Sequence, residues 1–155
     1  MINGAMMRVV ALVLVLTAVF ALDVVGAGCA TTPPTELAKQ ADGHREVALA
    51  LVHEADKAAE TGDTSLQDSK YREALRELLE GEKTGAMDAD GRYLLGLVYF
   101  IGFHRHEDAM KNLQLAVDLR QKERQEEYPE AENLMGAVLV DAGKPQDSIA
   151  HFEKA

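Results

Sequence analysis

Residues 130–155 read EAENLMGAVLVDAGKPQDSIAHFEKA, and this stretch decides the fold. Apolar residues recur at helical spacing on both sides of a break at 143–145, Gly-Lys-Pro. They are Leu134, Met135, Val138 and Leu139 before the break and Ile149, Phe152 and Ala155 after it. The pattern therefore predicts two helices, over 130–141 and 146–155, that pack on each other as a helical hairpin.

An earlier stretch of the chain repeats this pattern. The pair Leu95-Gly96 corresponds to Met135-Gly136, and Ala109 takes a small-residue position in the helix that follows. Both hairpins resemble the tetratricopeptide repeat, a family of two-helix units with a period of about 34 residues. The resemblance implies an all-α fold in which helical hairpins stack as a short right-handed solenoid.

The spacing between these two hairpins is longer than the family's period. From Gly96 to Gly136 there are 40 residues (136 − 96), against about 34 in the family. The excess falls in the turn at 101–106 and in the charged segment 121–127. We expect an extra helical turn in the latter segment, with Pro129 near the start of the next helix.

A third hairpin is expected in front of these two. Residues 71–75 resemble the second helix of another repeat, 46–60 would form its first helix, and 63–70 would be a long connection. The repeat domain would then cover 44–155, with a generic helical bundle as the alternative.

Terminal repeats need a capping helix. We therefore expect that the chain is the front part of a longer protein, the alternative being that a partner covers its last hairpin.

Composition supports helices and excludes one class of partner. Aromatic residues make up 5% of the chain, with no Trp, while good helix formers recur throughout. The 16 basic and 26 acidic side chains give a net charge of -10. Such a surface does not displace counterions from a phosphate backbone, so we expect no nucleic-acid partner.

The N-terminus has the pattern of an export signal. Arg8 precedes the apolar run 9–22, which is shorter than the roughly 20 residues that span a bilayer. Small residues then lead to Cys29, the one cysteine of the chain, and this arrangement resembles the lipobox of bacterial lipoproteins. Ordinary secretion and an uncleaved membrane anchor are the alternatives.

The lipobox resemblance implies a location as well as a modification. Residues 1–28 would be removed as a signal peptide, and Cys29 would carry a diacylglycerol and a further acyl chain such as palmitate. Three acyl chains exceed what stable anchoring needs. Residues 29–43 would be a tether, and Ala30 implies transfer to the outer membrane, with the domain facing the periplasm.

No motif predicts catalysis or a cofactor. No Ser lies in a G-x-S-x-G context, and the glycines form no phosphate-binding loop. His104 and His106 have a spacing that suits a metal, but they lie in the predicted turn without further strong ligands. We assign no metal, no cofactor and no small-molecule substrate, and we expect a protein that binds rather than an enzyme.

The repeat resemblance implies where a partner would bind, because the first helices of successive hairpins line a groove in that family. The corresponding residues are Asp90, Tyr93, Leu97, Phe100 and Ile101 in one helix and Glu130, Asn133, Ala137, Val140 and Asp141 in the next. Tyr93, Leu97 and Phe100 form one helical stripe, a candidate docking site for a peptide or a helix. The alternative is that a later helix of the same chain covers it.

Two functions fit a lipid-anchored repeat protein. The combination of signal, repeats and the run 128–133 resembles the pilotin lipoproteins of the type IV pilus, which implies an assembly factor for secretin subunits in the outer membrane. The alternative is an adaptor that recruits envelope hydrolases or proteases. The sequence leaves this choice open.

Overall fold

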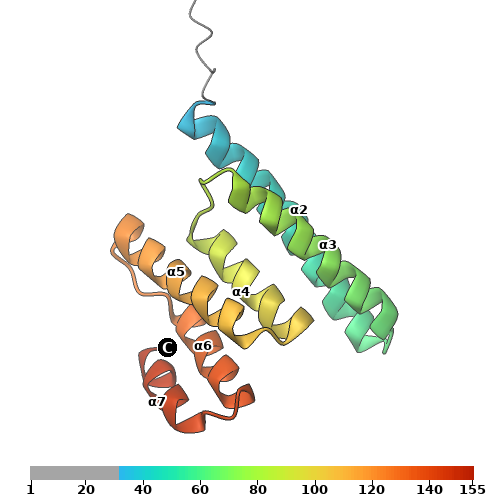
Figure 1. Ribbon diagram of the computed structural model, residues 1–155, viewed down its shortest axis with the longest axis vertical. Helices are drawn as coiled ribbons and strands as arrows, with labels where there is room; N and C mark the ends of the chain where they lie inside the picture. Colours follow the sequence, from blue (N-terminus) through green and yellow to red (C-terminus); the bar gives the residue numbers. More distant parts are fainter. Residues whose placement is uncertain (1–31) are drawn as a thin grey trace, which may run out of the picture. The chain divides into compact units, whose positions relative to one another are not determined.

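The computed structural model describes residues 32–155, which form α-helices joined by short turns (Figure 1). No strand occurs in this part of the chain. The helices are α2 (Pro34–Glu60), α3 (Thr64–Lys83), α4 (Ala89–Phe103), α5 (His106–Arg124), α6 (Pro129–Asp141) and α7 (Pro145–Lys154). The prediction of an all-α protein is confirmed.

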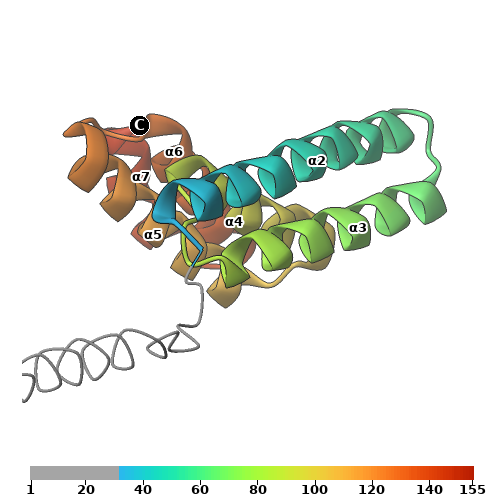
Figure 2. The same ribbon diagram turned by 90° about the horizontal axis from the view of Figure 1, so that it is seen from above.

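The helices pack as three successive hairpins. The most extensive contacts join α2 to α3, α4 to α5 and α6 to α7, and Figure 2 shows α2 and α3 side by side. Further contacts join α3 to α4 and α5 to α6, and the first helices touch in the order α2, α4, α6. Each hairpin therefore packs on the next one along the chain.

One apolar core runs through all three hairpins. Its largest fully buried side chains are Tyr71, Leu78, Leu95, Val98, Leu113, Met135 and Val138. Within residues 32–155, none of the helices has the length and apolar character needed to cross a membrane. The predicted signal peptide and Cys29 lie outside the described residues.

The first helix begins earlier than predicted. Residues 34–43 were assigned to the tether and the helix was expected from residue 46, but α2 starts at Pro34. Pro is well suited to the first helical position, where its missing N–H is not needed. Ala41 is 4% exposed and its carbonyl lies against Gly81 of α3, so burial extends the helix toward the N-terminus.

The second helix also begins earlier than predicted. Residues 63–70 were expected to be a long connection, but α3 starts at Thr64. The carboxylate of Asp63 accepts a hydrogen bond of 3.0 Å from the backbone N–H of Leu66, which caps the helix. Gly62, with φ of 75°, makes the preceding turn. The connection is therefore short.

The two later hairpins depend on close approach at a glycine of their first helix. A Cβ on Gly96 would lie 2.7 Å from Cγ of Leu113, and one on Gly136 would lie 2.5 Å from Cε1 of Phe152. Phe152 thus packs within its own hairpin, and it remains 43% exposed.

Helix α5 continues into the charged segment, and α6 begins at Pro129, as predicted. Helix α5 continues to Arg124 and ends at Gln125, whose φ of 55° is left-handed. Helix α6 then begins at Pro129. The last turn of α5 therefore includes much of the charged segment 121–127.

Candidate partner-binding site

The ten residues predicted to line a groove lie on the outward sides of α4 and α6. The half-buried or exposed side chains are Asp90, Tyr93, Leu97, Phe100 and Ile101 in α4 and Glu130, Asn133, Ala137, Val140 and Asp141 in α6. The opposite sides of these helices face the core. Tyr93, Leu97 and Phe100 all pack against the core as well, so the predicted apolar stripe is only partly open to solvent.

The structure distributes these residues over several places. Asp90 and Tyr93 line a cleft between α2 and α4. Glu130 and Asn133 line a depression beside α7. Asp141 contacts the first residue of α5. The cleft is the candidate site because it joins two predicted residues to a second hairpin, and we call it the α2–α4 cleft.

The α2–α4 cleft has a volume of about 370 Å³. Its lining residues are Arg45, Glu46 and Leu49 of α2, Asp90, Tyr93 and Leu94 of α4, and Tyr128, which directly precedes α6. This volume lies in the range of small ligand pockets, so the cleft fits a side chain rather than a whole helix. Sequence reasoning missed the α2 residues, because the first hairpin lacks the Leu-Gly pair that fixes the register of the others.

Asp90 holds the cleft together through partners on three elements. Its carboxylate accepts a hydrogen bond of 2.8 Å from the Tyr128 hydroxyl and pairs with Arg120 of α5. On the α2 side, Arg45 lies 3.8 Å from the same carboxylate and pairs with Asp88. One side chain therefore links all three hairpins, and Asp90 has a structural role in addition to lining the cleft.

Two tyrosines form the aromatic part of the cleft. The rings of Tyr93 and Tyr128 are tilted by 35°, with centroids 5.4 Å apart. Burial raises the pKa of the Tyr128 phenol, and its hydrogen bond to Asp90 raises it further. Burial also raises the pKa of Tyr93, with a further contribution from the carboxylate of Glu130. Both phenols therefore stay neutral at physiological pH.

Asp141 is already engaged within the protein. Its carboxylate lies 2.7 Å from Nε2 of His106 and 4.0 Å from Nδ1 of His104. The His106 ring also lies 6.2 Å from the ring of Phe100, between centroids. These contacts join the second hairpin to the third, so Asp141, which is predicted to line the groove, also links two hairpins.

Two other histidines have partners that sequence reasoning missed. The imidazole of His44 lies 2.9 Å from Glu77, and that of His151 lies 2.6 Å from Glu132. Each pair joins the two helices of one hairpin. Among residues 32–155 there is no group of three or more histidine, cysteine or acidic side chains placed to hold a metal ion.

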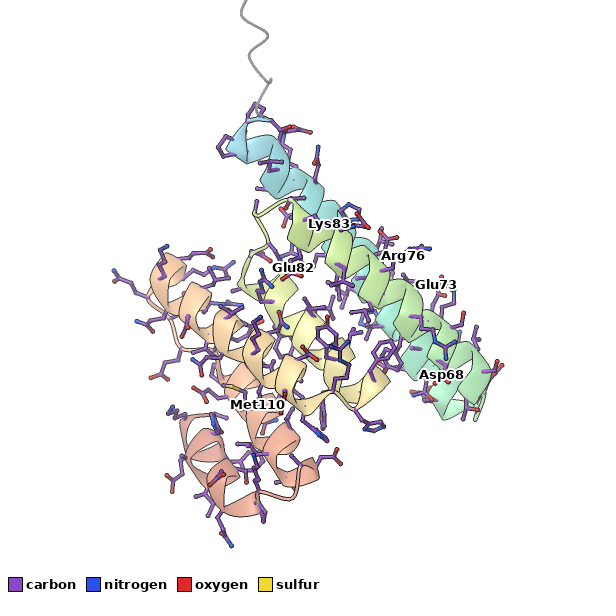
Figure 3. The ribbon with its side chains drawn as sticks, in the orientation of Figure 1. Asp68, Glu73, Arg76, Glu82, Lys83 and Met110 are labelled. Atoms are coloured by element: carbon purple, nitrogen blue, oxygen red, sulfur yellow. The ribbon has the colours of Figure 1, made fainter. Side chains whose placement is uncertain are left out.

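A second cleft, of about 440 Å³, lies between α3 and the end of α4, where Phe103 lines it together with Leu75 and Leu79. Figure 3 shows charged side chains spread along α3, among them Asp68, Glu73, Arg76, Glu82 and Lys83. Lys83 pairs with Glu80 at 2.6 Å and Arg76 with Glu77 at 3.3 Å. Ion pairs within one helix are typical of a solvated surface. We assign no function to this cleft.

A third cleft, of about 490 Å³, lies between α5 and α7. Acidic side chains dominate its lining, with Lys154 as the basic one. Its least exposed carboxylate, that of Glu132, already pairs with His151 and Lys154. The remaining acids are exposed, which again indicates a solvated surface.

Comparison of the sequence with protein-family models and with curated proteins gives no match. The function therefore has to be argued from the site, since a helical fold by itself does not define one.

Proposed function

We propose that this chain is a lipid-anchored scaffold of the tetratricopeptide-repeat type that binds a protein partner along α2, α4 and α6. The observation that carries the proposal is the α2–α4 cleft, where aromatic, apolar and acidic side chains from successive hairpins surround one small volume. A protein that binds extended segments needs such side-chain pockets on an accessible face.

The solenoid arrangement belongs to this proposal. It is supported by the contacts between successive first helices, α2 with α4 and α4 with α6. It is supported too by the close packing at Gly96 and Gly136, the positions at which the repeat resemblance requires a small residue. Stacked hairpins of this kind use the face of their first helices for binding.

The anchor is proposed from the sequence, with Cys29 as the lipidated residue in the outer membrane and the domain in the periplasm. Since α2 begins at Pro34, the chain from Cys29 to the helix spans at most about 18 Å. A lipid on Cys29 would therefore hold the start of α2 close to the membrane surface. Partners embedded in that membrane are then within reach of the scaffold.

The assembly that fits best is the type IV pilus, with this chain as a pilotin for secretin subunits. The support is the combination of lipobox, hairpins and the run 128–133 that includes the cleft residue Tyr128. An adaptor that recruits envelope hydrolases or proteases is the alternative. Such an adaptor would have the same lipid anchor and the same binding face as a pilotin, but it would capture a different protein.

The test is affinity purification of the full-length chain from gently solubilised membranes, with Cys29→Ala in parallel. Secretin subunits captured by the unaltered chain and mislocalised in cells that carry Cys29→Ala support the pilotin. Cell-wall hydrolases or proteases in their place support the adaptor. Capture of secretin that is identical without the cysteine overturns the role of the lipid, and capture of no envelope protein overturns the scaffold.

A further inference from the structure

The walls of the α2–α4 cleft are apolar and aromatic. Leu49 and Leu94 face it together with the rings of Tyr93 and Tyr128. Leu49 is 44% exposed, unusually open for a leucine that lines a recess. Such walls accept the methylene groups of a long side chain.

The basic side chains in and next to the cleft are already paired. Arg45 lines the cleft, and Arg120 packs on the ring of its Tyr128. The guanidinium of Arg45 pairs with Asp88 and lies 3.3 Å from Asp42. The guanidinium of Arg120 pairs with Asp90. Neither group is available to an incoming anion without breaking an existing ion pair.

One carboxylate of the cleft is left without such a pair. Glu46 lines the cleft and is exposed. It forms no ion pair within residues 32–155. The cleft therefore has an excess of negative charge beside its aromatic walls, which is complementary to a cation.

The protein itself shows how a cation packs here. Cζ of Arg120 lies 4.1 Å from the centroid of the Tyr128 ring, a cation–π contact. The neighbouring ring of Tyr93 is half-buried and has a part of its surface open to the cleft. It offers the same kind of contact to a cation that comes from outside.

We propose that the α2–α4 cleft binds a lysine or arginine side chain from an extended segment of the protein partner. The alkyl stem packs on Leu49 and Leu94, and the charged end lies on Tyr93 beside Glu46. The inference rests on the proposed scaffold function and specifies the chemistry of its partner. The net charge of -10 on the chain favours encounter with a basic segment in the same way.

The experiment uses the full-length chain in detergent micelles with its tyrosines labelled for NMR. Three capped pentapeptides are titrated, each with four glycines around a central lysine, norleucine or glutamate. The chain has four tyrosines, so Tyr→Phe variants assign the ring signals. We expect the lysine peptide alone to shift the Tyr93 and Tyr128 signals in a saturable manner.

Charge reversal on one helix supplies the matched control. Glu46→Lys changes the cleft, while Glu60→Lys makes the same change at an exposed position at the end of α2. Reversing one exposed carboxylate removes a single charge pair between the protein and the peptide, which lowers the binding affinity by about fivefold. We expect that loss for Glu46→Lys and unchanged affinity for Glu60→Lys, with equal helical circular dichroism in both.

Three outcomes of these titrations overturn the inference. Equal binding of the norleucine peptide makes the cleft merely apolar, and preferred binding of the glutamate peptide makes it an anion site. Equal losses in the two variants mean that only the overall charge matters. If envelope proteins are still captured while the lysine peptide does not bind, the scaffold function stands and the cation site fails. If the lysine peptide binds while no envelope protein is captured, the cation site stands and the scaffold function fails.

Discussion

Replacement of Gly96 by alanine tests whether the hairpins are held by close helix approach. The new Cβ would lie 2.7 Å from Cγ of Leu113 and 3.2 Å from the backbone oxygen of Ala109. Leu113 is 0% exposed and lies in the core, so its side chain cannot turn out toward solvent. Overpacking of a core lowers the free energy of unfolding by about 1–3 kcal/mol, whereas the better helix propensity of alanine raises it by about 1 kcal/mol. We expect Gly96→Ala to lower the free energy of unfolding by up to about 2 kcal/mol.

Two further glycines provide the comparison for the same chemical change. At Gly136 the new Cβ would meet the ring of Phe152, which is 43% exposed and free to turn outward. We expect Gly136→Ala to stay within about 1 kcal/mol of the unaltered protein. At Gly43, inside α2, nothing lies within 4 Å of the Cβ. At this position only the helix propensity changes, so Gly43→Ala should raise the free energy of unfolding by about 1 kcal/mol.

The assay is urea unfolding of the full-length chain, followed by circular dichroism at a helix band. The expected order of stability is Gly43→Ala above Gly136→Ala above Gly96→Ala. A Gly96→Ala protein as stable as Gly43→Ala would show that α4 and α5 do not approach each other closely at this point. The hairpin packing described above would then be refuted.

Three further predictions concern single polar side chains. Asp90→Ala leaves the buried Tyr128 hydroxyl without an acceptor, so it should lower the free energy of urea unfolding by about 1–3 kcal/mol, and Asp90→Asn by less. The hydrogen bond from His44 lowers the pKa of Glu77 below its ordinary 4.5, so this pair stabilises the fold above that pH and is lost as the pH falls through the lowered value. The urea midpoint of His44→Ala should accordingly fall less between pH 6 and pH 3 than that of the unaltered chain. Asp63→Ala removes the side-chain cap of α3 and should lower the free energy of unfolding by about 1 kcal/mol in the same assay. Asp63→Ser should retain most of this capping contribution.

The later hairpins were predictable because their packing leaves a local signature. A helix that approaches another closely needs a glycine at the contact, and Gly96 and Gly136 are visible in the sequence together with the apolar residues around them. The helix starts at Pro34 and Thr64 were missed for the opposite reason. Proline, threonine and aspartate are typical of linkers as well as of helix starts, and burial of Ala41 decides between the two only in three dimensions.

The site was less predictable than the fold. Helical spacing places Asp90 and Tyr93 on the outward side of α4, but it contains no information on which residues of α2 lie opposite them. The pairing of Asp141 with His106 joins residues from different hairpins, and no short-range pattern encodes such a contact. Residues that act across hairpins therefore had to come from the structure.

The contacts of Asp90 have a consequence for how local unfolding spreads. Stacked hairpins open most easily at their ends, and helices α2 and α6 do not touch each other within the described residues. Yet Arg45 on one side and Tyr128 on the other share the same carboxylate. When one end unfolds locally, the Asp90 carboxylate loses its partner at that end. Its interaction with the partner at the opposite end then changes in strength. Amide hydrogen exchange in α2 and α6 would then be correlated although neither helix contacts the other.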